Sequence, residues 1–203
     1  MTYQIPSPED WLALLSKIKA DLAALDEADK QWLHGRIAVI EQHQRALDDL
    51  FESAGGTSAC ADCDGACCGC GRHHITLTNL LSYLIEDIDP PSPDFTRTCP
   101  YLGENGCRLP VARRPYNCIT FFCEQLEETL DDEKRRRLRE LDKRLREEYQ
   151  AVEDRYPAAS LRGIWIALGH IDDCLLYTSP SPRDQRPNLV CRLLREKGGG
   201  GGG

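Results

Sequence analysis

The residues of this chain with the clearest capacity for chemistry are its cysteines. There are 11 in 203 residues, and nine of them fall between Cys60 and Cys123. Four of the nine form a Cys-x2-Cys-x3-Cys-Cys run in a Gly-rich segment, namely Cys60, Cys63, Cys67 and Cys68. Two sulfurs of a Cys-x2-Cys turn can approach one ion at about 2.3 Å, and the cation itself favours the thiolate form. The run therefore predicts a thiolate metal site.

A second set of cysteines lies further along the chain: Cys99, Cys107, Cys118 and Cys123. Together the two sets supply eight sulfurs, enough for two four-cysteine sites or for one iron–sulfur cluster and one zinc. Side chains on adjacent α-carbons diverge, so we expect Cys67 and Cys68 to serve different metals or different irons of one cluster. Cys70, His73 and His74 follow the first run closely, and their roles stay open.

Thiolates around a metal need positive neighbours, because a four-cysteine zinc carries a charge of about −2. Several arginines lie close to the cysteines in sequence: Arg72, Arg97, Arg108, Arg113 and Arg114. We expect these arginines to donate hydrogen bonds around the sulfurs before any role in substrate binding.

Residues 174–203 differ in origin from the rest of the chain. The stretch from Cys174 to Asp184 reads CLLYTSPSPRD, which resembles the translation of a transposase sequencing adapter, and six glycines end the chain. Such residues were never selected to pack, so we expect 174–203 to be disordered. The natural chain is expected to continue differently after Asp173, and Cys174 and Cys191 are excluded from the cluster.

The remaining composition indicates a single acidic domain. Removing five basic residues from 25 and two acidic residues from 33 leaves 20 Lys and Arg against 31 Asp and Glu, a net charge of about −11. This balance disfavours nonspecific binding to nucleic acid or to anionic membranes. No stretch approaches the ~20 apolar residues of a membrane span, and the first residues do not resemble a signal peptide. We expect a cytoplasmic protein whose cysteines bind metal rather than form disulfides.

The elements that must carry the cysteines are mostly helical. The run Ser7-Pro8-Glu9-Asp10 is typical of a helix start. Apolar residues then recur at helical spacing from Trp11 to Leu25 and again from Leu33 to Phe51. We expect two helices that form an antiparallel hairpin over residues 1–55.

Residues 56–125 are expected to form an irregular, cysteine-rich metal-binding region. The first cysteine run should occupy a loop, and Thr78 should cap a short apolar helix after it. The turn-forming sequence Gly103-Glu104-Asn105-Gly106 predicts a small β-hairpin with Cys99 on one arm and Cys107 on the other.

Residues 126–173 read as C-terminal helices. A single charged helix is expected from about Glu124 to Tyr156, supported by pairs four residues apart such as Asp131 with Arg135. Its narrow apolar seam at Leu138–Leu145 is a candidate surface for a partner helix from another protein.

Several short motifs occur together in this chain: the Cys-x2-Cys-x3-Cys-Cys run, Cys99-Pro-Tyr-Leu, Gly106-Cys107, Arg114-Pro115-x2-Cys118 and a last Cys123. In combination they resemble the YkgJ-type cysteine-cluster family over residues 60–123. The resemblance implies a domain that chelates zinc or iron through eight cysteines: Cys60, Cys63, Cys67, Cys68, Cys99, Cys107, Cys118 and Cys123. The family often has Arg after the cysteine matching Cys118 and Pro before the last cysteine. This chain has Ile119 and Phe122 there, so an anion-binding role of that Arg is not carried over.

The sequence thus predicts a mostly α protein in which helical hairpins surround an irregular cysteine-rich insert with a small β-hairpin. Zinc, iron or an iron–sulfur cluster is the expected cofactor. The leading interpretation is a metal-binding protein. A distant similarity to flagellin lysine N-methylases adds a second one, an iron–sulfur-dependent methylase or redox enzyme acting on a protein side chain. A third is a helical protein-interaction module with a structural metal.

Overall fold

The structure is a computed structural model, and it describes residues 6–62, 68, 71, 73–104, 106–167 and 175–176. These residues are mostly helical with a two-stranded antiparallel β-hairpin, which confirms the expected fold class. The elements are α1 (Pro8–Ala24), α2 (Glu27–Ser53), α3 (Gly56–Asp62), α4 (Leu77–Leu84), β1 (Leu102–Gly103), β2 (Gly106–Cys107), η2 (Val111–Arg113), α5 (Tyr116–Ile119), α6 (Glu124–Thr129), α7 (Asp132–Arg155), η3 (Pro157–Ala159) and α8 (Ile164–Ala167). Across the described ranges, none of these helices is both long and apolar enough to span a bilayer.

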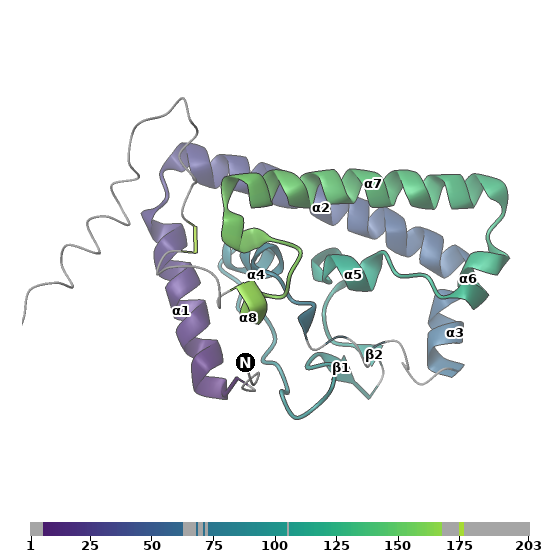
Figure 1. The fold of residues 1–203 in the computed structure, drawn as a ribbon, viewed down its shortest axis with the longest axis horizontal. Helices are drawn as coiled ribbons and strands as arrows, with labels where there is room; N and C mark the ends of the chain where they lie inside the picture. The colour runs from purple at the N-terminus through teal and green to yellow at the C-terminus, as the bar shows by residue number, and fades with distance from the viewer. Residues whose placement is uncertain are drawn as a thin grey trace, which may run out of the picture.

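The two long helices, α2 and α7, form the frame of the molecule and lie side by side in opposite directions (Figure 1). Arg36 Nη1 lies 2.9 Å from Glu148 Oε2, and Arg155 near the end of α7 pairs with Asp29 near the start of α2. The buried residues along the two helices are Leu33, Ile37, Ile40, Gln44 and Leu47 of α2 and Leu141, Leu145, Tyr149 and Val152 of α7.

The apolar seam of α7 is covered within the chain itself. Leu141 and Leu145 are 2% and 0% exposed, and Leu138 is partly buried against the same core. An apolar stripe is buried by whichever apolar face reaches it, and α2 supplies that face here. The Leu138–Leu145 seam is therefore an internal contact, which corrects its interpretation as a surface for a partner protein.

The first helix starts as predicted but does not pair with the second. Ser7 Oγ accepts a hydrogen bond from the Asp10 N–H (3.2 Å), and the Asp10 carboxylate accepts one from the Ser7 N–H (2.8 Å). α1 then runs at a steep angle to α2 (Figure 1) and packs on α4 instead. The Trp11 ring lies 6.4 Å from the Trp165 ring of α8. The expected antiparallel hairpin over residues 1–55 is not formed because α7 occupies the apolar stripe of α2.

α4 lies at the centre of the fold, and all of its residues from Leu77 to Leu84 are buried. The helix is capped by Thr76 rather than by Thr78. Thr76 Oγ1 accepts from the Asn79 N–H (3.3 Å), and Asn79 Oδ1 accepts from the Thr76 N–H (3.1 Å). Only Thr76 has a side chain three residues later that can return the hydrogen bond, whereas the Thr78 hydroxyl donates to the Ala159 carbonyl (3.5 Å).

The charged helix expected from Glu124 to Tyr156 is interrupted near Leu130. Leu130 has an extended backbone and is buried, so α6 ends before it. Asp131 Oδ1 accepts a hydrogen bond from the Lys134 N–H (2.8 Å) and starts α7 as its N-cap. Arg135 consequently lies near Asp132 (3.8 Å) instead of pairing with Asp131. A capping carboxylate is worth more than an exposed ion pair, which explains the break.

The β-hairpin forms around the predicted turn. Leu102 pairs with Cys107 and Gly103 with Gly106, and Gly106 has a φ of 103°, a conformation that favours glycine. The Cys99 carbonyl accepts from the Leu102 N–H at 3.1 Å. The hairpin therefore carries Cys107 on its second strand and Cys99 just before its first.

One main apolar core draws on all three regions that the sequence analysis separates. It also contains Leu175 and Leu176, which are 1% and 2% exposed, and the Leu175 N–H donates to Asp21 Oδ2 at 2.8 Å. These two leucines correct the expectation of disorder throughout 174–203, whose other residues lie outside the described ones. Burial of apolar side chains is favourable whatever the origin of the sequence, so these two adjacent leucines can pack on the core.

Candidate metal centre

Six of the cysteines predicted to bind metal lie among the described residues. Cys60 lies in α3, Cys68 in an isolated turn, Cys99 before β1, Cys107 in β2, Cys118 in α5 and Cys123 at the start of α6. Cys63 and Cys67, like Cys70, fall outside the described residues. The loop expected from Cys60 onward is corrected in its first part. Gly55, with a φ of 79°, turns the chain after α2, and a new helical turn then carries Cys60.

The closest contact between a predicted ligand and another donor joins Cys118 to His74. The Nδ1 atom of His74 lies 3.2 Å from the Sγ atom of Cys118. Two backbone hydrogen bonds hold the segment that carries His74. The His74 N–H donates to the Gly71 carbonyl (3.2 Å), and the Ile164 N–H, from the start of α8, donates to the Ile75 carbonyl (2.7 Å). A residue beside the first cysteine run is thus brought against a cysteine of the second set.

A second close approach links the same segment to Cys99. A Cβ atom added to Gly71 would lie 2.8 Å from Cys99 Sγ, closer than real Cβ contacts allow. Gly71 therefore permits the backbone to lie directly on this sulfur. Together with the contact between His74 and Cys118, it places Gly71 and His74 against two cysteines of the second set.

The thiols near this point also affect one another electrostatically. The residue Cys118 is exposed as a whole, but burial of its sulfur raises the pKa of its thiol. The thiols of Cys107, Cys99 and Cys68 raise that pKa further. Burial likewise raises the pKa of Cys99, and Cys107 adds to the effect. Like charges at short range disfavour ionisation of each group. These four cysteines therefore share one electrostatic environment; we call them, with His74, the central group.

The imidazole of His74 is suited to bind a cation. Burial lowers the pKa of His74, and neighbouring His73 lowers it further, so the ring is neutral at physiological pH. Among the described Cys, His, Asp and Glu residues, however, no three already surround a common point as metal ligands do. The described residues of the central group thus contain one close contact, between His74 and Cys118, and not the geometry of a metal site.

The chain before Cys118 is anchored by a buried polar cluster. The carbonyl of Arg114 accepts hydrogen bonds from Gln44 Nε2 (2.6 Å) and Asn79 Nδ2 (3.0 Å). The Tyr149 hydroxyl lies 3.4 Å from Gln44 Nε2 and 3.1 Å from Asn79 Nδ2. Helices α2, α4 and α7 therefore jointly hold the Arg114-Pro115 step from which the Cys118 helix starts.

This cluster is not among the sites predicted from the sequence, although one residue indicates it. Gln44 falls at helical spacing between Ile40 and Leu47 in the apolar stripe of α2, yet it is 0% exposed. A polar residue at a core position must find buried partners. Tyr149 similarly continues the seam of α7.

The described arginines near the cysteines also make contacts with carboxylates and backbone carbonyls. The positive charge of Arg114 lowers the pKa of Cys118, and that of Arg108 lowers the pKa of Cys99. Arg113 pairs with Glu41 (3.4 Å) and Glu86, and Arg114 lies 3.8 Å from Asp48. Arg108 donates to two backbone carbonyls, those of Ser92 (2.9 Å) and Pro100 (2.8 Å). Arg72 lies outside the described residues. The principal role of these described guanidinium groups is thus to join loops and helices.

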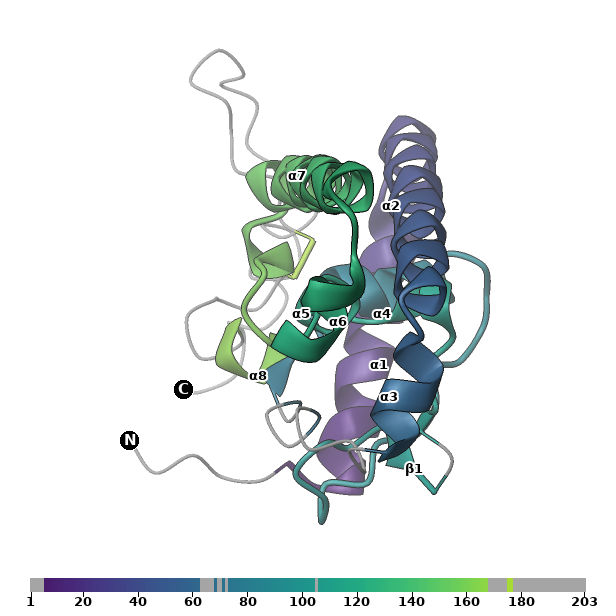
Figure 2. The ribbon, with the colours of Figure 1, turned by 90° about the vertical axis from the view of Figure 1, so that its right-hand side faces the viewer.

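Cys60 and Cys123 belong to a different part of the molecule. Cys123 and Ala59, the neighbour of Cys60, both pack on a small apolar cluster of Phe122, Leu126 and Leu130. α3 and α6 lie next to each other at the end of the molecule where α2 stops and α7 begins (Figure 1, Figure 2). Cys123 and the helix that carries Cys60 therefore meet at the α3–α6 end.

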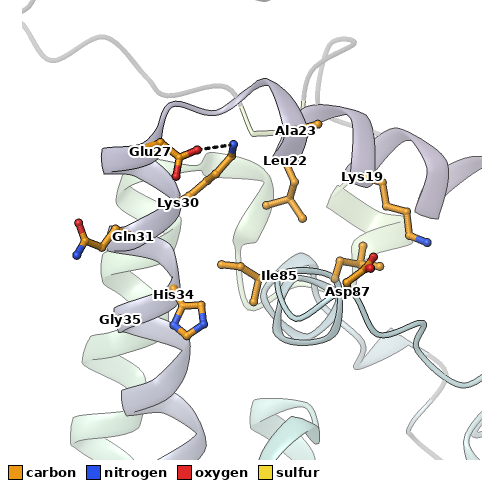
Figure 3. Close-up of a pocket in the computed structure, with 11 residues that line it drawn as sticks. Lys19, Leu22, Ala23, Glu27, Lys30, Gln31, His34, Gly35, Ile85 and Asp87 are labelled. Carbon is orange, nitrogen blue, oxygen red and sulfur yellow. Dashed lines mark hydrogen bonds and ion pairs between the residues drawn. The ribbon is translucent and has the colours of Figure 1, made fainter.

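One groove of the described residues is not lined by cysteines. It has a volume of about 860 Å³ and lies between α1, α2 and the end of α4, with Leu22, Ile85 and His34 on its walls (Figure 3). Lys30 at its rim is paired with Glu27 (3.0 Å). No cysteine lines the groove, so it is not part of the candidate metal centre.

Comparison with known proteins adds no further constraint. No family model, curated protein or solved structure matches the chain. The resemblance to the YkgJ-type family therefore stays a prediction based on the motifs quoted above.

Proposed function

We propose that this chain is a cytoplasmic metal-binding protein whose cysteine cluster holds zinc or iron. The observation that carries the proposal is the contact between His74 Nδ1 and Cys118 Sγ, 3.2 Å apart, which joins a residue beside the first cysteine run to a cysteine of the second set. The influence of Cys107, Cys99 and Cys68 on the pKa of Cys118 agrees with it. Neighbouring thiolates repel one another, so these cysteines do not readily ionise together without a cation. A bound cation reverses this, because it stabilises the thiolates and releases their protons.

The chemistry of the described donors fits such an ion, although their spacing must contract. Soft thiolate ligands select zinc, iron–sulfur clusters or cuprous copper. Since no three described donors yet surround one point, loading should draw Cys99, Cys107 and Cys118 together. Metal binding is then expected to add stability to the region around the β-hairpin and α5.

Cys60, Cys63, Cys67 and Cys123 are proposed as the ligands of a second site. Cys123 and the α3 helix that carries Cys60 meet at the α3–α6 end, and Cys63 and Cys67 follow Cys60 closely in sequence. The resemblance to the YkgJ-type family supports a ligand role for all eight cysteines. A division between Cys67 and Cys68 agrees with the divergence of adjacent side chains.

The direct test is elemental analysis together with a visible spectrum of the full chain purified without oxygen. We expect stoichiometric zinc or iron in the unaltered protein. Cys118→Ser should remove metal from the central group, whereas Ser58→Ala, an exposed change on α3, should leave the content unchanged. A protein that purifies without metal and takes up neither zinc nor ferrous iron under reducing conditions would contradict the proposal.

The same spectrum addresses the enzymatic interpretation. A brown protein with a broad visible band that dithionite bleaches would favour an iron–sulfur methylase or redox enzyme. A colourless protein with stoichiometric zinc would exclude that interpretation and support a zinc centre.

A further inference from the structure

We propose that Tyr116 is a positioning residue that holds Cys118 against His74, and that its contact with Asp142 makes helix α7 part of this arrangement. The hydroxyl of Tyr116 donates a hydrogen bond to Asp142 Oδ1 on α7. Cys118 follows on the same short helix, and its Sγ atom lies 3.2 Å from His74 Nδ1. Both contacts belong to the protein without metal, so the role of Tyr116 goes beyond the proposed function and does not depend on it.

The helix α5 is too short to hold Cys118 in place by itself. It has four residues, Tyr116–Ile119, and the N–H groups of Cys118 and Ile119 both donate to the Pro115 carbonyl, at 2.9 and 3.1 Å. A single helical turn is unstable on its own, because its first hydrogen bond requires several backbone dihedrals to be fixed. The buried anchor at the Arg114 carbonyl fixes where the turn starts. The side chains on the turn must then fix its orientation.

The buried side chain of Tyr116 is held by one face of α7, which lies above α5 in both views (Figure 1, Figure 2). The ring of Tyr149 lies 5.6 Å from the Tyr116 ring in an edge-to-face arrangement. The guanidinium carbon of Arg146 lies 5.2 Å from the centre of the same ring. Asp142, Arg146 and Tyr149 follow one another at helical spacing, so they share one face of α7. A hydrogen bond, a ring contact and a cation–π contact therefore fasten α5 to α7 through one side chain.

The carboxylate of Asp142 connects this arrangement to the surface. Tyr116 donates to its Oδ1 atom, and Arg146 Nη2 lies 4.0 Å from its Oδ2 atom. Hydrogen bonds to a charged group are stronger than those between neutral groups. The side chains of Asp142 and Arg146 are 35% and 59% exposed, so solvent and other molecules can reach this end of the contact. A partner or a charge placed at Asp142 should therefore alter the contact between Cys118 and His74.

The segment that carries His74 is held by contacts that do not involve α5. The Ile164 N–H donates to the Ile75 carbonyl (2.7 Å), and Gly163 lies against the backbone of His73. These contacts should persist when Tyr116 is altered. A change at the pair of His74 and Cys118 then reports a movement of α5.

The test compares Tyr116→Phe, which removes only the hydroxyl, with the unaltered full chain, both reduced and freed of metal with a chelator. Hydrogen exchange at the amides of Cys118 and Ile119 should become about 5–30-fold faster in Tyr116→Phe, because a hydrogen bond to a carboxylate is lost. The nuclear Overhauser effect between the His74 ring and the β-protons of Cys118 should weaken, which a purely global loss of stability would not cause. Tyr83→Phe is the matched tyrosine control, since the Tyr83 hydroxyl has no hydrogen-bond partner among the described residues. It should change neither signal.

Variants of Asp142 test the other side of the same hydrogen bond. Asp142→Ala should reproduce the effect of Tyr116→Phe, whereas Asp142→Asn, which keeps an acceptor oxygen, should have a smaller effect. The double variant of Tyr116→Phe with Asp142→Ala should exchange no faster than either single variant, because each removes the same contact. Unchanged signals in Tyr116→Phe, multiplied effects in the double variant, or equally faster exchange in α1 would each overturn the positioning role.

Zinc titration separates this role from the proposed function. If the unaltered chain binds zinc, Tyr116→Phe should bind it more weakly by a similar factor, because Cys118 is held less well before the metal arrives. Equal affinities would refute a role of Tyr116 in that site. If the unaltered chain takes up neither zinc nor ferrous iron, the proposed function fails, and the exchange and Overhauser measurements still decide the role of Tyr116.

Discussion

Gly163 lies directly on the backbone of His73. A Cβ atom added at Gly163 would stand 1.9 Å from the His73 carbonyl oxygen and 2.6 Å from its carbonyl carbon. The neighbouring Ile164 N–H donates to the Ile75 carbonyl at 2.7 Å. The segment before α8 thus supports the stretch that carries His74, although the two are far apart in the sequence.

Gly163→Ala should therefore disturb the segment that carries His74, and with it the proposed metal centre, from a distance. Because the obstacle is backbone rather than a flexible side chain, the residues around His73 must move, and we expect a loss of stability of about 1–3 kcal/mol. Zinc affinity should fall as well. Chemical denaturation and zinc titration measure the two effects. Gly35→Ala in α2 is the control, since a Cβ there meets nothing within 4 Å, and it should stabilise the helix by about 0.5–1 kcal/mol. Equal behaviour of the two variants would refute the role of Gly163.

Gly71→Ala should destabilise the packing around Cys99. The added methyl group would lie 2.8 Å from Cys99 Sγ, so the segment or the sulfur must shift. We expect a cost of about 1–2 kcal/mol in the metal-free protein. The double variant Gly71→Ala with Cys99→Ala removes the clash, so its loss should be smaller than the sum of the two single losses. Additive losses in this double-mutant cycle would show that the two residues do not touch.

Gln44→Ala should be far more costly than an ordinary surface change on the same helix. It removes the donor to the buried Arg114 carbonyl (2.6 Å) and a neighbour of the Tyr149 hydroxyl. Asn79 Nδ2 still donates to both groups, so the variant loses one of two hydrogen bonds at each and the packing of a fully buried side chain, which together should cost about 1–3 kcal/mol. Gln31→Ala, an exposed position of α2, should change stability by less than about 0.5 kcal/mol. Thermal or urea unfolding of both variants gives the comparison, and similar values for the two would argue against the buried anchor.

Two buried tyrosines should respond oppositely to loss of their hydroxyl groups. The Tyr83 hydroxyl has no hydrogen-bond partner among the described residues, whereas that of Tyr149 accepts from Asn79 and Gln44. Tyr83→Phe should leave stability at neutral pH unchanged or slightly higher, and Tyr149→Phe should lower it by about 1 kcal/mol. Urea unfolding at pH 7 measures both. A larger loss in Tyr83→Phe would indicate a partner for its hydroxyl.

Stability should also fall in alkaline solution because of Tyr83. Burial raises the pKa of Tyr83 from 10.0 to about 12. The folded state therefore favours the neutral phenol. Its contribution is fully present below pH 10 and is lost as the pH rises toward 12. Denaturation of the metal-free protein between pH 9 and pH 12, with tyrosinate absorbance as a second signal, measures the loss. Tyr83→Phe should make the decline shallower, and an unchanged pH dependence would contradict this assignment.

Much of the secondary structure could be predicted because its signals are local. The Ser7 cap, the apolar periodicity of α2 and the turn at Gly103–Gly106 each depend on residues within a few positions of one another. Local signals also misled where two of them competed. Asp131 could have paired with Arg135 or capped α7, and Thr76 and Thr78 were both able to start α4. Hydrogen bonds that form only in the folded backbone decided between these options.

The sequence by itself determined which residues could bind a metal and which helix faces had to be buried, because residue type and spacing define donors and stripes. Tertiary structure decided the partners. An apolar stripe specifies a face but not what covers it, so α2 pairs with α7 rather than with α1. Cysteine spacing likewise shows which sulfurs can meet only when both belong to the same short turn of the chain. The contact between His74 and Cys118, and the packing of Cys123 beside α3, follow from how the helices pack.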